Sequence, residues 1–368
     1  MTFSPLIGPL MIDIETTSLG PEDRDILLHP RVGGLIFFTR NYTDRKQLRE
    51  LVTEIRSLRA TDLSLSPLLI AVDQEGGRVQ RLRHEFTELP PLRWLGHLYN
   101  QNPSLAREMA MCAARVMAVE ILDAGIDFSF APVIDIDWGK SDIIGHRALH
   151  SQPDVVSELG LAYRQGMRQV GMAAVAKHFP GHGGVTADSH HMLSVDTRTY
   201  AELLEDMHPY SCLINNGLHG IMMAHIRYPD IELQIASLSG FWMQNIIRET
   251  LGFHGAIFSD DLSMAGASEG GTVAERVTTS LNNGADMVLI CNDRSAVIST
   301  LEAIDSVTNS PIDGYVKPVS HTRLAAMGAV HAHYDAAPYL SDKWQRDVER
   351  LLQVWEAQPR PSKTPYFG

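Results

Sequence analysis

Cysteine is scarce in this sequence. Three of its 368 residues are Cys, namely Cys112, Cys212 and Cys291, and they lie far apart in segments with an apolar helix or strand pattern. Metal ligation by these thiols is disfavoured, because none has a paired ligand at close spacing. An odd and scattered set predicts free, reduced thiols and is typical of a cytoplasmic protein.

Segments that direct a chain into or across a membrane are also missing. The first residues, MTFSPLIGPLMIDIE, do not combine a basic start with an apolar stretch and a small-residue cleavage site, so they do not resemble a signal peptide. No apolar run approaches the ~20 residues that are needed to span a bilayer. We therefore expect a cytoplasmic protein without a membrane partner.

Basic residues are fewer than acidic residues in this sequence. The chain has 31 Lys and Arg against 44 Asp and Glu, which gives a net charge of −13, and no run of basic residues appears. A nucleic-acid partner is not expected, because neutralising phosphates requires a basic face. No GxGxxG motif follows the first predicted strand, so nothing indicates a dinucleotide, and we expect no cofactor.

Short apolar runs recur along the chain, each about as long as one strand, and most lack the polar alternation of a half-exposed sheet. This pattern is typical of strands buried on both faces. The eight runs are residues 10–15, 33–39, 67–74, 126–136, 171–179, 220–226, 255–261 and 286–293. Amphipathic segments with helical periodicity separate most of them, at 45–59, 104–125, 154–170, 202–216 and 272–284. The alternation predicts a parallel sheet, and eight repeats favour a closed (β/α)8 barrel.

The periodicity changes after residue 310. Residues 339–358 are predicted to form a capped helix that packs on the outside of the barrel, and the last ten residues, with three Pro, look frayed. We predict a catalytic barrel over residues 1–310 and a helical extension over 311–368, with no second domain. We expect the protein to be a monomer.

Polar residues gather where a barrel keeps its active site, at the carboxyl ends of the strands. Asp73 ends the third predicted strand, Lys177 and His178 end the fifth, and Asp260 and Asp261 end the seventh. Neighbouring side chains in a strand point to opposite faces, so at most one of the two last Asp residues is expected to face the mouth. Further candidates at the same end are Arg78, Arg81, Asp135, Asp137, Arg147, His225 and Ser259.

Three motifs together resemble glycoside hydrolase family 3: AVDQEGGRVQR (71–81), KHFPGHGGVTADSH (177–190) and IFSDDLSM (257–264). More closely, they are similar to the single-domain bacterial β-N-acetylglucosaminidases of peptidoglycan recycling, over nearly the whole chain. The resemblance implies a TIM barrel and a retaining exo-β-N-acetylglucosaminidase without a metal. Its expected substrates are muropeptides that carry N-acetylglucosamine on an anhydro-muramic acid.

The resemblance also implies the catalytic residues. Asp260 is the expected nucleophile, since a retaining glycosidase forms a covalent glycosyl-enzyme on a carboxylate. His190 is the expected acid/base and Asp188 the group that orients it. An imidazole with a pKa near ~6.5 exchanges protons easily at neutral pH, and residues two apart in an extended segment leave the backbone on one side.

Sugar-binding roles are implied for Asp73, Arg81, Arg147, Lys177 and His178. Charge-assisted hydrogen bonds from these groups can orient the ring hydroxyls. The loop around Arg147 departs from the family pattern. Its neighbours His146, Ala148 and Leu149 stand where relatives usually have an acidic residue, Ser and an aromatic.

Other functions remain open from the residues alone. His178, His182, His190 and Asp260 could form the ligand set of a metal-dependent barrel hydrolase that activates water. A non-catalytic sugar-binding barrel would keep Asp73 and Arg147. A third alternative is a glycoside phosphorylase, in which phosphate replaces water in the second step because a neutral His base repels an anion less than a carboxylate does.

Overall fold

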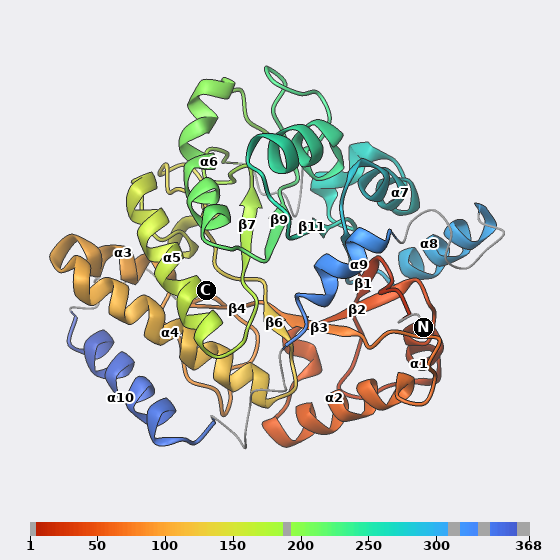
Figure 1. The fold of residues 1–368 in the computed structure, drawn as a ribbon, viewed down its shortest axis with the longest axis horizontal. Coiled ribbons are helices and arrows are strands. Elements are labelled where there is room, and N and C mark those ends of the chain that lie inside the picture. Colours follow the sequence, from red (N-terminus) through yellow and green to blue (C-terminus); the bar gives the residue numbers. More distant parts are fainter. Residues whose placement is uncertain (1–4, 187–192, 308–316, 330–338, 359–368) are drawn as a thin grey trace.

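The computed structural model describes residues 5–186, 193–307, 317–329 and 339–358. It contains one eight-stranded parallel sheet, surrounded by helices (Figure 1). The strand order is β6-β3-β2-β1-β12-β11-β9-β7. The strands are β1 (Leu10–Ile12), β2 (Val32–Phe37), β3 (Leu69–Val72), β6 (Phe128–Ser129), β7 (Val175–Phe179), β9 (Gly220–Met223), β11 (Ala256–Asp261) and β12 (Met287–Ile290).

The segment after β6 joins the sheet to its other edge. Val133 forms a parallel bridge with Lys177. The Val175 N–H donates to the carbonyl of Ala131 at 2.9 Å, and the Ile134 N–H donates to the carbonyl of Lys177 at 3.0 Å. All eight predicted strands are present, and the predicted (β/α)8 barrel is confirmed.

Several helices on the outside begin at side chains that cap them. Asp44 accepts from the Gln47 N–H at the start of α2, and Thr199 and Glu202 form a capping box at α6, as helix N-termini require. The five amphipathic segments are helices. Their bounds are α2 (Arg45–Arg59), α4 (Pro103–Asp123), α5 (Pro153–Gln169), α6 (Tyr200–Asn215) and α7 (Val273–Asn283). The periodicity did not predict α1 (Pro21–Leu27), α3 (Leu92–Gln101), α8 (Arg294–Val307) or the π-helix η4 (Phe241–Thr250).

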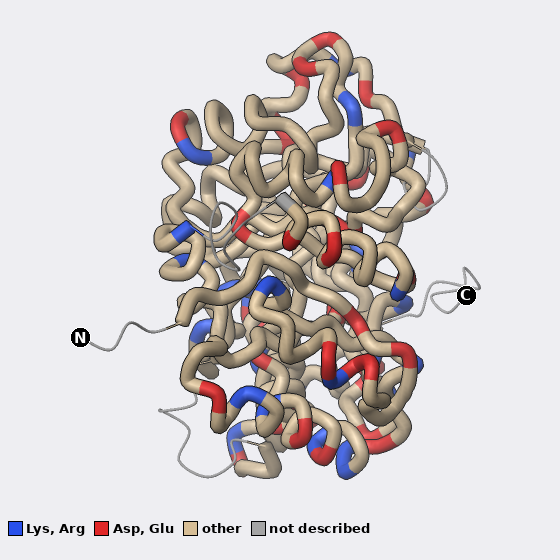
Figure 2. Tube along the Cα trace, turned by 90° about the vertical axis from the view of Figure 1, so that its right-hand side faces the viewer, with Lys and Arg blue, Asp and Glu red and all other residues tan. Residues whose placement is uncertain are grey.

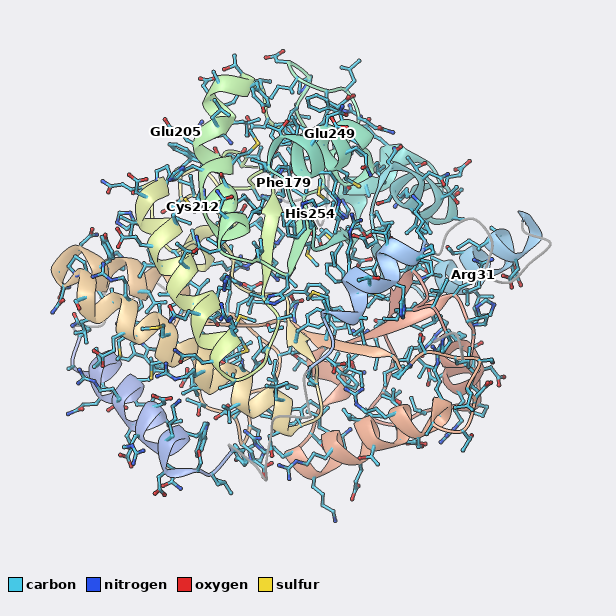
Figure 3. The ribbon with its side chains drawn as sticks, viewed as in Figure 1. Arg31, Phe179, Glu205, Cys212, Glu249 and His254 are labelled. Carbon is cyan, nitrogen blue, oxygen red and sulfur yellow. The ribbon has the colours of Figure 1, made fainter. Side chains whose placement is uncertain are left out.

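The interior of the barrel is filled by apolar side chains from different strands. The rings of Phe128 and Phe258 lie edge-on to Phe130, with centroids 5.2 and 5.4 Å away. Figure 3 places Phe179 inside the ring of helices, whereas Glu205 and Glu249 lie on the outer elements. Acidic and basic residues are interspersed along the outer surface (Figure 2). No described helix is both long and apolar enough to cross a membrane.

Within the described residues after the barrel, the chain forms the helices α9 (Pro318–Ala325) and α10 (Asp342–Glu356). Helix α10 runs beside α4 (Figure 1), and Arg115 of α4 binds both carboxylate oxygens of Asp347, at 2.7 and 2.8 Å. The predicted boundary at residue 310 and the frayed last ten residues fall outside the described residues, so the division into two parts stays a prediction.

Candidate active site

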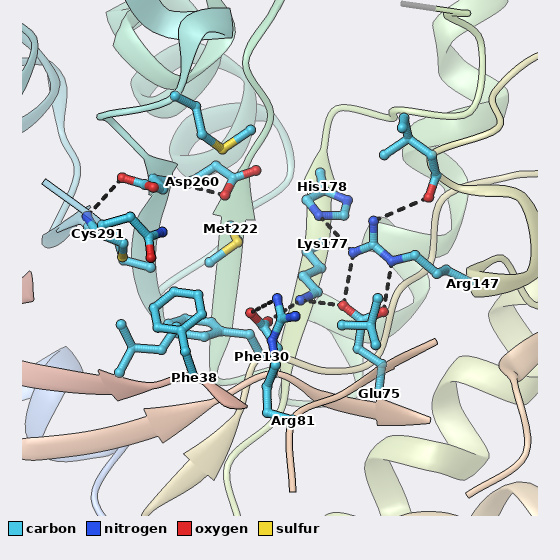
Figure 4. Close-up of a pocket in the computed structure, with 18 of the residues that line it drawn as sticks. Phe38, Glu75, Arg81, Phe130, Arg147, Lys177, His178, Met222, Asp260 and Cys291 are labelled. Atoms are coloured by element: carbon cyan, nitrogen blue, oxygen red, sulfur yellow. Dashed lines mark hydrogen bonds and ion pairs between the residues drawn. The ribbon is translucent and has the colours of Figure 1, made fainter. Parts of the chain in front are cut away.

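A cavity of about 620 Å³ opens at the carboxyl ends of the barrel strands. Its polar residues come from widely separated segments. Six of the eight residues with a predicted catalytic or sugar-binding role line it: Asp73, Arg81, Arg147, Lys177, His178 and Asp260. Lys177, His178, Arg147 and Glu75 form one side, Asp260 and Cys291 lie opposite, and Met222 lies between them (Figure 4). Asp188 and His190, the other two residues with a predicted catalytic role, lie outside the described residues.

Lys177 is held between two carboxylates. Its Nζ lies 2.7 Å from Oδ1 of Asp73 and 2.6 Å from Oε1 of Glu75. Burial alone would lower the pKa of Lys177, but the charges of Asp73 and Glu75 outweigh it and raise the pKa. The ammonium group therefore stays charged at the floor of the cavity.

Glu75 also binds Arg147. Two parallel hydrogen bonds join them, from Nε to Oε2 at 2.8 Å and from Nη2 to Oε1 at 2.9 Å. Sequence reasoning missed Glu75, although it lies in the AVDQEGGRVQR motif, since the pattern there does not show which polar residue turns inward. Once buried, a carboxylate between two cations orients both of them.

Asp135 holds the ring of His178. Its Oδ2 lies 2.7 Å from Nδ1 of His178, and its Oδ1 accepts the backbone N–H of His182 at 2.7 Å. Nη2 of Arg147 lies 3.4 Å from Nε2 of His178. Arg can only donate, so the neutral form of the ring that fits this geometry has its proton on Nδ1 and its lone pair on Nε2.

Asp260 at the end of β11 is an ionised carboxylate. Burial alone would raise its pKa, but His225, His178, the Asp261 N–H and Lys177 lower the pKa to about 2. Oδ1 accepts the Asp261 N–H at 2.8 Å. Oδ2 has no hydrogen-bond partner within the described part of the chain, so one oxygen is available for chemistry.

The expectation that at most one of Asp260 and Asp261 faces the mouth was wrong, since both line the cavity. The register of β11 against β12 shifts between Phe258 and Asp261. This irregularity interrupts the alternation of side chains on which the expectation depended.

His225 is fully buried below this strand end. Its Nε2 lies 2.8 Å from the carbonyl oxygen of Asp261, and its Nδ1 lies 2.7 Å from Oγ of Ser237. A carbonyl can only accept, so the proton is on Nε2 and the Ser237 hydroxyl donates to Nδ1. Burial lowers the pKa of His225 by more than the charge of Asp260 raises it.

The metal alternative required His178, His182, His190 and Asp260. Among the residues that the structure describes, no group of three or more His, Cys, Asp or Glu side chains could hold a metal ion. His178 is instead bound to Asp135 and Arg147, while His190 lies outside these residues.

The model of the glycosyl hydrolase family 3 N-terminal domain matches residues 11–320 of this chain. The chain belongs to glycosyl hydrolase family 3. A β-hexosaminidase of Thiobacillus denitrificans is 46% identical over 336 residues, covering 91% of this chain and 89% of the relative. A β-hexosaminidase of Alkalilimnicola ehrlichii is 47% identical over 356 residues, covering 96% of each.

Solved structures of family 3 share the fold. NagZ from Neisseria gonorrhoeae, in complex with N-trifluoroacetyl-D-glucosamine, superposes with a TM-score of 0.86 at 36% identity, covering 96% of this chain and 99% of that one. A family 3 β-N-acetylglucosaminidase from a Paenibacillus species gives a TM-score of 0.80 at 29% identity, covering 93% of this chain and 66% of that one. This family 3 member is thus a glycoside hydrolase of the β-N-acetylhexosaminidase type.

Proposed function

We propose that this enzyme is a retaining exo-β-N-acetylglucosaminidase in which Asp260 is the nucleophile. The observation that carries the proposal is the state of Asp260: its pKa is lowered to about 2, and its Oδ2 lacks a hydrogen-bond partner among the described residues. The cations on the opposite side of the cavity suit a sugar whose hydroxyl groups they can bind. A carboxylate in this position can attack the anomeric carbon of that sugar.

In the first step Oδ2 of Asp260 forms a bond to the anomeric carbon as the glycosidic C–O bond breaks, and His190 gives its proton to the leaving oxygen. In the second step His190 takes a proton from water. That water opens the glycosyl-enzyme and regenerates the Asp260 carboxylate. Asp188 orients His190 and stabilises its protonated form, as a carboxylate does beside other catalytic imidazoles. Asp73, Arg81, Arg147, Lys177 and His178 bind the hydroxyl groups.

The proposed substrates are muropeptides in which N-acetylglucosamine is joined to an anhydro-muramic acid. Support comes from the motifs shared with peptidoglycan-recycling enzymes and from the likeness to NagZ. We place the enzyme in the cytoplasm as a monomer, a location that fits its three free cysteines, of which Cys112 and Cys291 are buried.

A slow fluorosugar substrate that accumulates the glycosyl-enzyme tests the nucleophile. Peptide mass spectrometry should find the sugar on Asp260, and the D260N variant should remain unlabelled. A label on another residue, or turnover by D260N at the wild-type rate, would overturn the assignment. Product analysis in phosphate buffer separates the alternative second step, since a phosphorylase would accumulate the sugar 1-phosphate.

A further inference from the structure

The hydroxyl of Ser263, just beyond β11, is close to more acceptors than it has protons. Its Oγ lies 2.7 Å from Oδ1 and 2.8 Å from Oδ2 of Asp261, and 2.7 Å from the carbonyl oxygen of Cys291. A serine hydroxyl carries a single proton. If Asp261 were ionised, that proton could serve either the carboxylate or the carbonyl. One pair of oxygens would then face each other at hydrogen-bond distance without a proton between them.

A proton on Asp261 supplies a second hydrogen to these three contacts, so that both the carboxyl group and the carbonyl of Cys291 are hydrogen-bonded to Oγ of Ser263. Its Oδ2–H then donates to Oγ of Ser263, and the Ser263 hydroxyl donates to the carbonyl of Cys291. Oδ1, now the carbonyl oxygen of a neutral acid, accepts the N–H of Ser263 at 2.9 Å and that of Cys291 at 3.0 Å. Each of these polar groups has a partner of the right kind, as groups in such buried networks normally do.

The backbone of the same residue holds Asp260. The Asp261 N–H donates to Oδ1 of Asp260 at 2.8 Å, and the Asp261 carbonyl accepts from Nε2 of His225 at 2.8 Å. We propose that Asp261 is a positioning residue that works as a neutral carboxylic acid. The adjacent pair then carries one negative charge, and Asp260 carries it. This inference rests on the proposed function of Asp260 as the nucleophile.

The titratable groups around Asp261 favour its neutral form below about pH 6. They are Asp260 on β11, His225 after β9, Cys291 after β12 and Arg276 on α7. Burial raises the pKa of Asp261; hydrogen bonds from Ser263 and Cys291 lower it and the charge of Asp260 raises it, with a net pKa of about 6. The Cys291 thiol has a pKa raised by burial. Arg276 directs Nη1 to the carbonyl of Leu262, at 2.7 Å.

The protonation state can be measured without reference to catalysis. Carboxyl carbons of Asp are labelled with ¹³C, and their NMR signals are followed over pH in the full-length protein, with D261N identifying the signal of Asp261. We expect a carboxyl group that is protonated at pH 5 and titrates near 6. An Asp261 signal that stays ionised down to the ordinary pKa of about 4 would overturn the proposal.

Two variants test the positioning role. In D261N the amide reproduces the neutral acid, because Nδ2–H can donate to Ser263 and Oδ1 can still accept both N–H groups. We expect kcat and KM at pH 5, where Asp261 is protonated, within about threefold of the wild type, since an isosteric change that keeps each hydrogen bond is close to neutral. In D261A the hydrogen bonds of this side chain to Ser263 and Cys291 are lost. The backbone of residue 261 then holds Asp260 less well, and kcat should fall about 10²-fold with little change in KM. Equal loss in D261N and D261A would contradict the proposal.

Asp286 offers a matched control. It is a buried carboxylate that binds cations, with Arg248 at 2.7 Å and Arg323 at 3.1 Å. D286N should therefore lower the temperature of thermal unfolding clearly, whereas D261N should leave it close to the wild type. If the fluorosugar does not label Asp260, the proposed function fails. The NMR titration still decides the state of Asp261, so the two failures are distinguishable.

Discussion

Arg147 and Glu75 lie 72 positions apart in the chain and form a bidentate ion pair at the edge of the cavity, with N–O distances of 2.8 and 2.9 Å. Lys177 adds a third contact to Glu75, at 2.6 Å. Burial alone would raise the pKa of Glu75, but the charges of Arg147 and Lys177 keep the pKa below its usual range. One carboxylate thus fixes two cations that face the proposed sugar site.

The E75Q variant tests this pairing. Removing the charge leaves two buried cations without their shared partner, and breaking a buried pair in this way costs about 3–5 kcal/mol of unfolding free energy. We expect kcat/KM to fall about 10²-fold as well, since both cations lose their position. Chemical unfolding and steady-state kinetics measure the two effects. E158Q is the control, because Glu158 pairs with Arg107 on the exposed surface and such pairs contribute about 0–1 kcal/mol.

Asp135 should affect substrate binding through His178. D135N weakens the 2.7 Å hydrogen bond to Nδ1 of His178, and a hydrogen bond to a charged group contributes about 1.5–3 kcal/mol. We expect kcat/KM to fall at least about tenfold, mainly through a higher KM. If His178 does not bind the sugar, D135N and H178A will both leave KM unchanged.

His182 should make stability depend on pH. Burial and the charge of His178 lower its pKa from 6.5 to about 4. The unfolded chain therefore binds more protons than the folded one between these values, and stability is full above about pH 6.5 and is lost as pH falls toward 4. H182Q should flatten this part of the curve, measured as unfolding free energy against pH. H84Q, a change at an exposed histidine, should leave the slope as in the wild type.

His190 should matter most for poor leaving groups. In H190A the leaving oxygen receives no proton, so kcat/KM should fall about 10²–10⁴-fold for a sugar aglycone. For substrates whose aryl aglycone leaves as a stable phenolate, kcat/KM should fall least, because the leaving oxygen needs little protonation at the glycosylation step. Comparing kcat/KM over aryl glycosides of graded leaving-group pKa measures this. Equal losses across the series would argue against His190 as the acid.

Ser259 is an example of a residue whose position the strand pattern predicted correctly. Its place at the end of an apolar run predicted a position at the carboxyl end of a barrel strand, and there its Oγ accepts the N–H of Leu289 at 3.1 Å. Asp73, Lys177 and Asp260 were predicted at the same end for the same reason, and the cavity brings them together. The helix α3 was missed, as was the role of Glu75 in orienting two cations.

The sequence by itself determined the eight buried strands, five of the helices between them and the end of the barrel that holds the polar residues. Runs of apolar residues report burial, and parallel strands bring their carboxyl ends to one face. Only the tertiary structure decided which polar groups pair. The partners of Glu75 come from strand β7 and from a short 3-10 helix over residues 145–147. The β11–β12 register brings both Asp260 and Asp261 to the cavity. Hydrogen bonds between distant segments depend on three-dimensional distance, which the periodicity of a single chain does not contain.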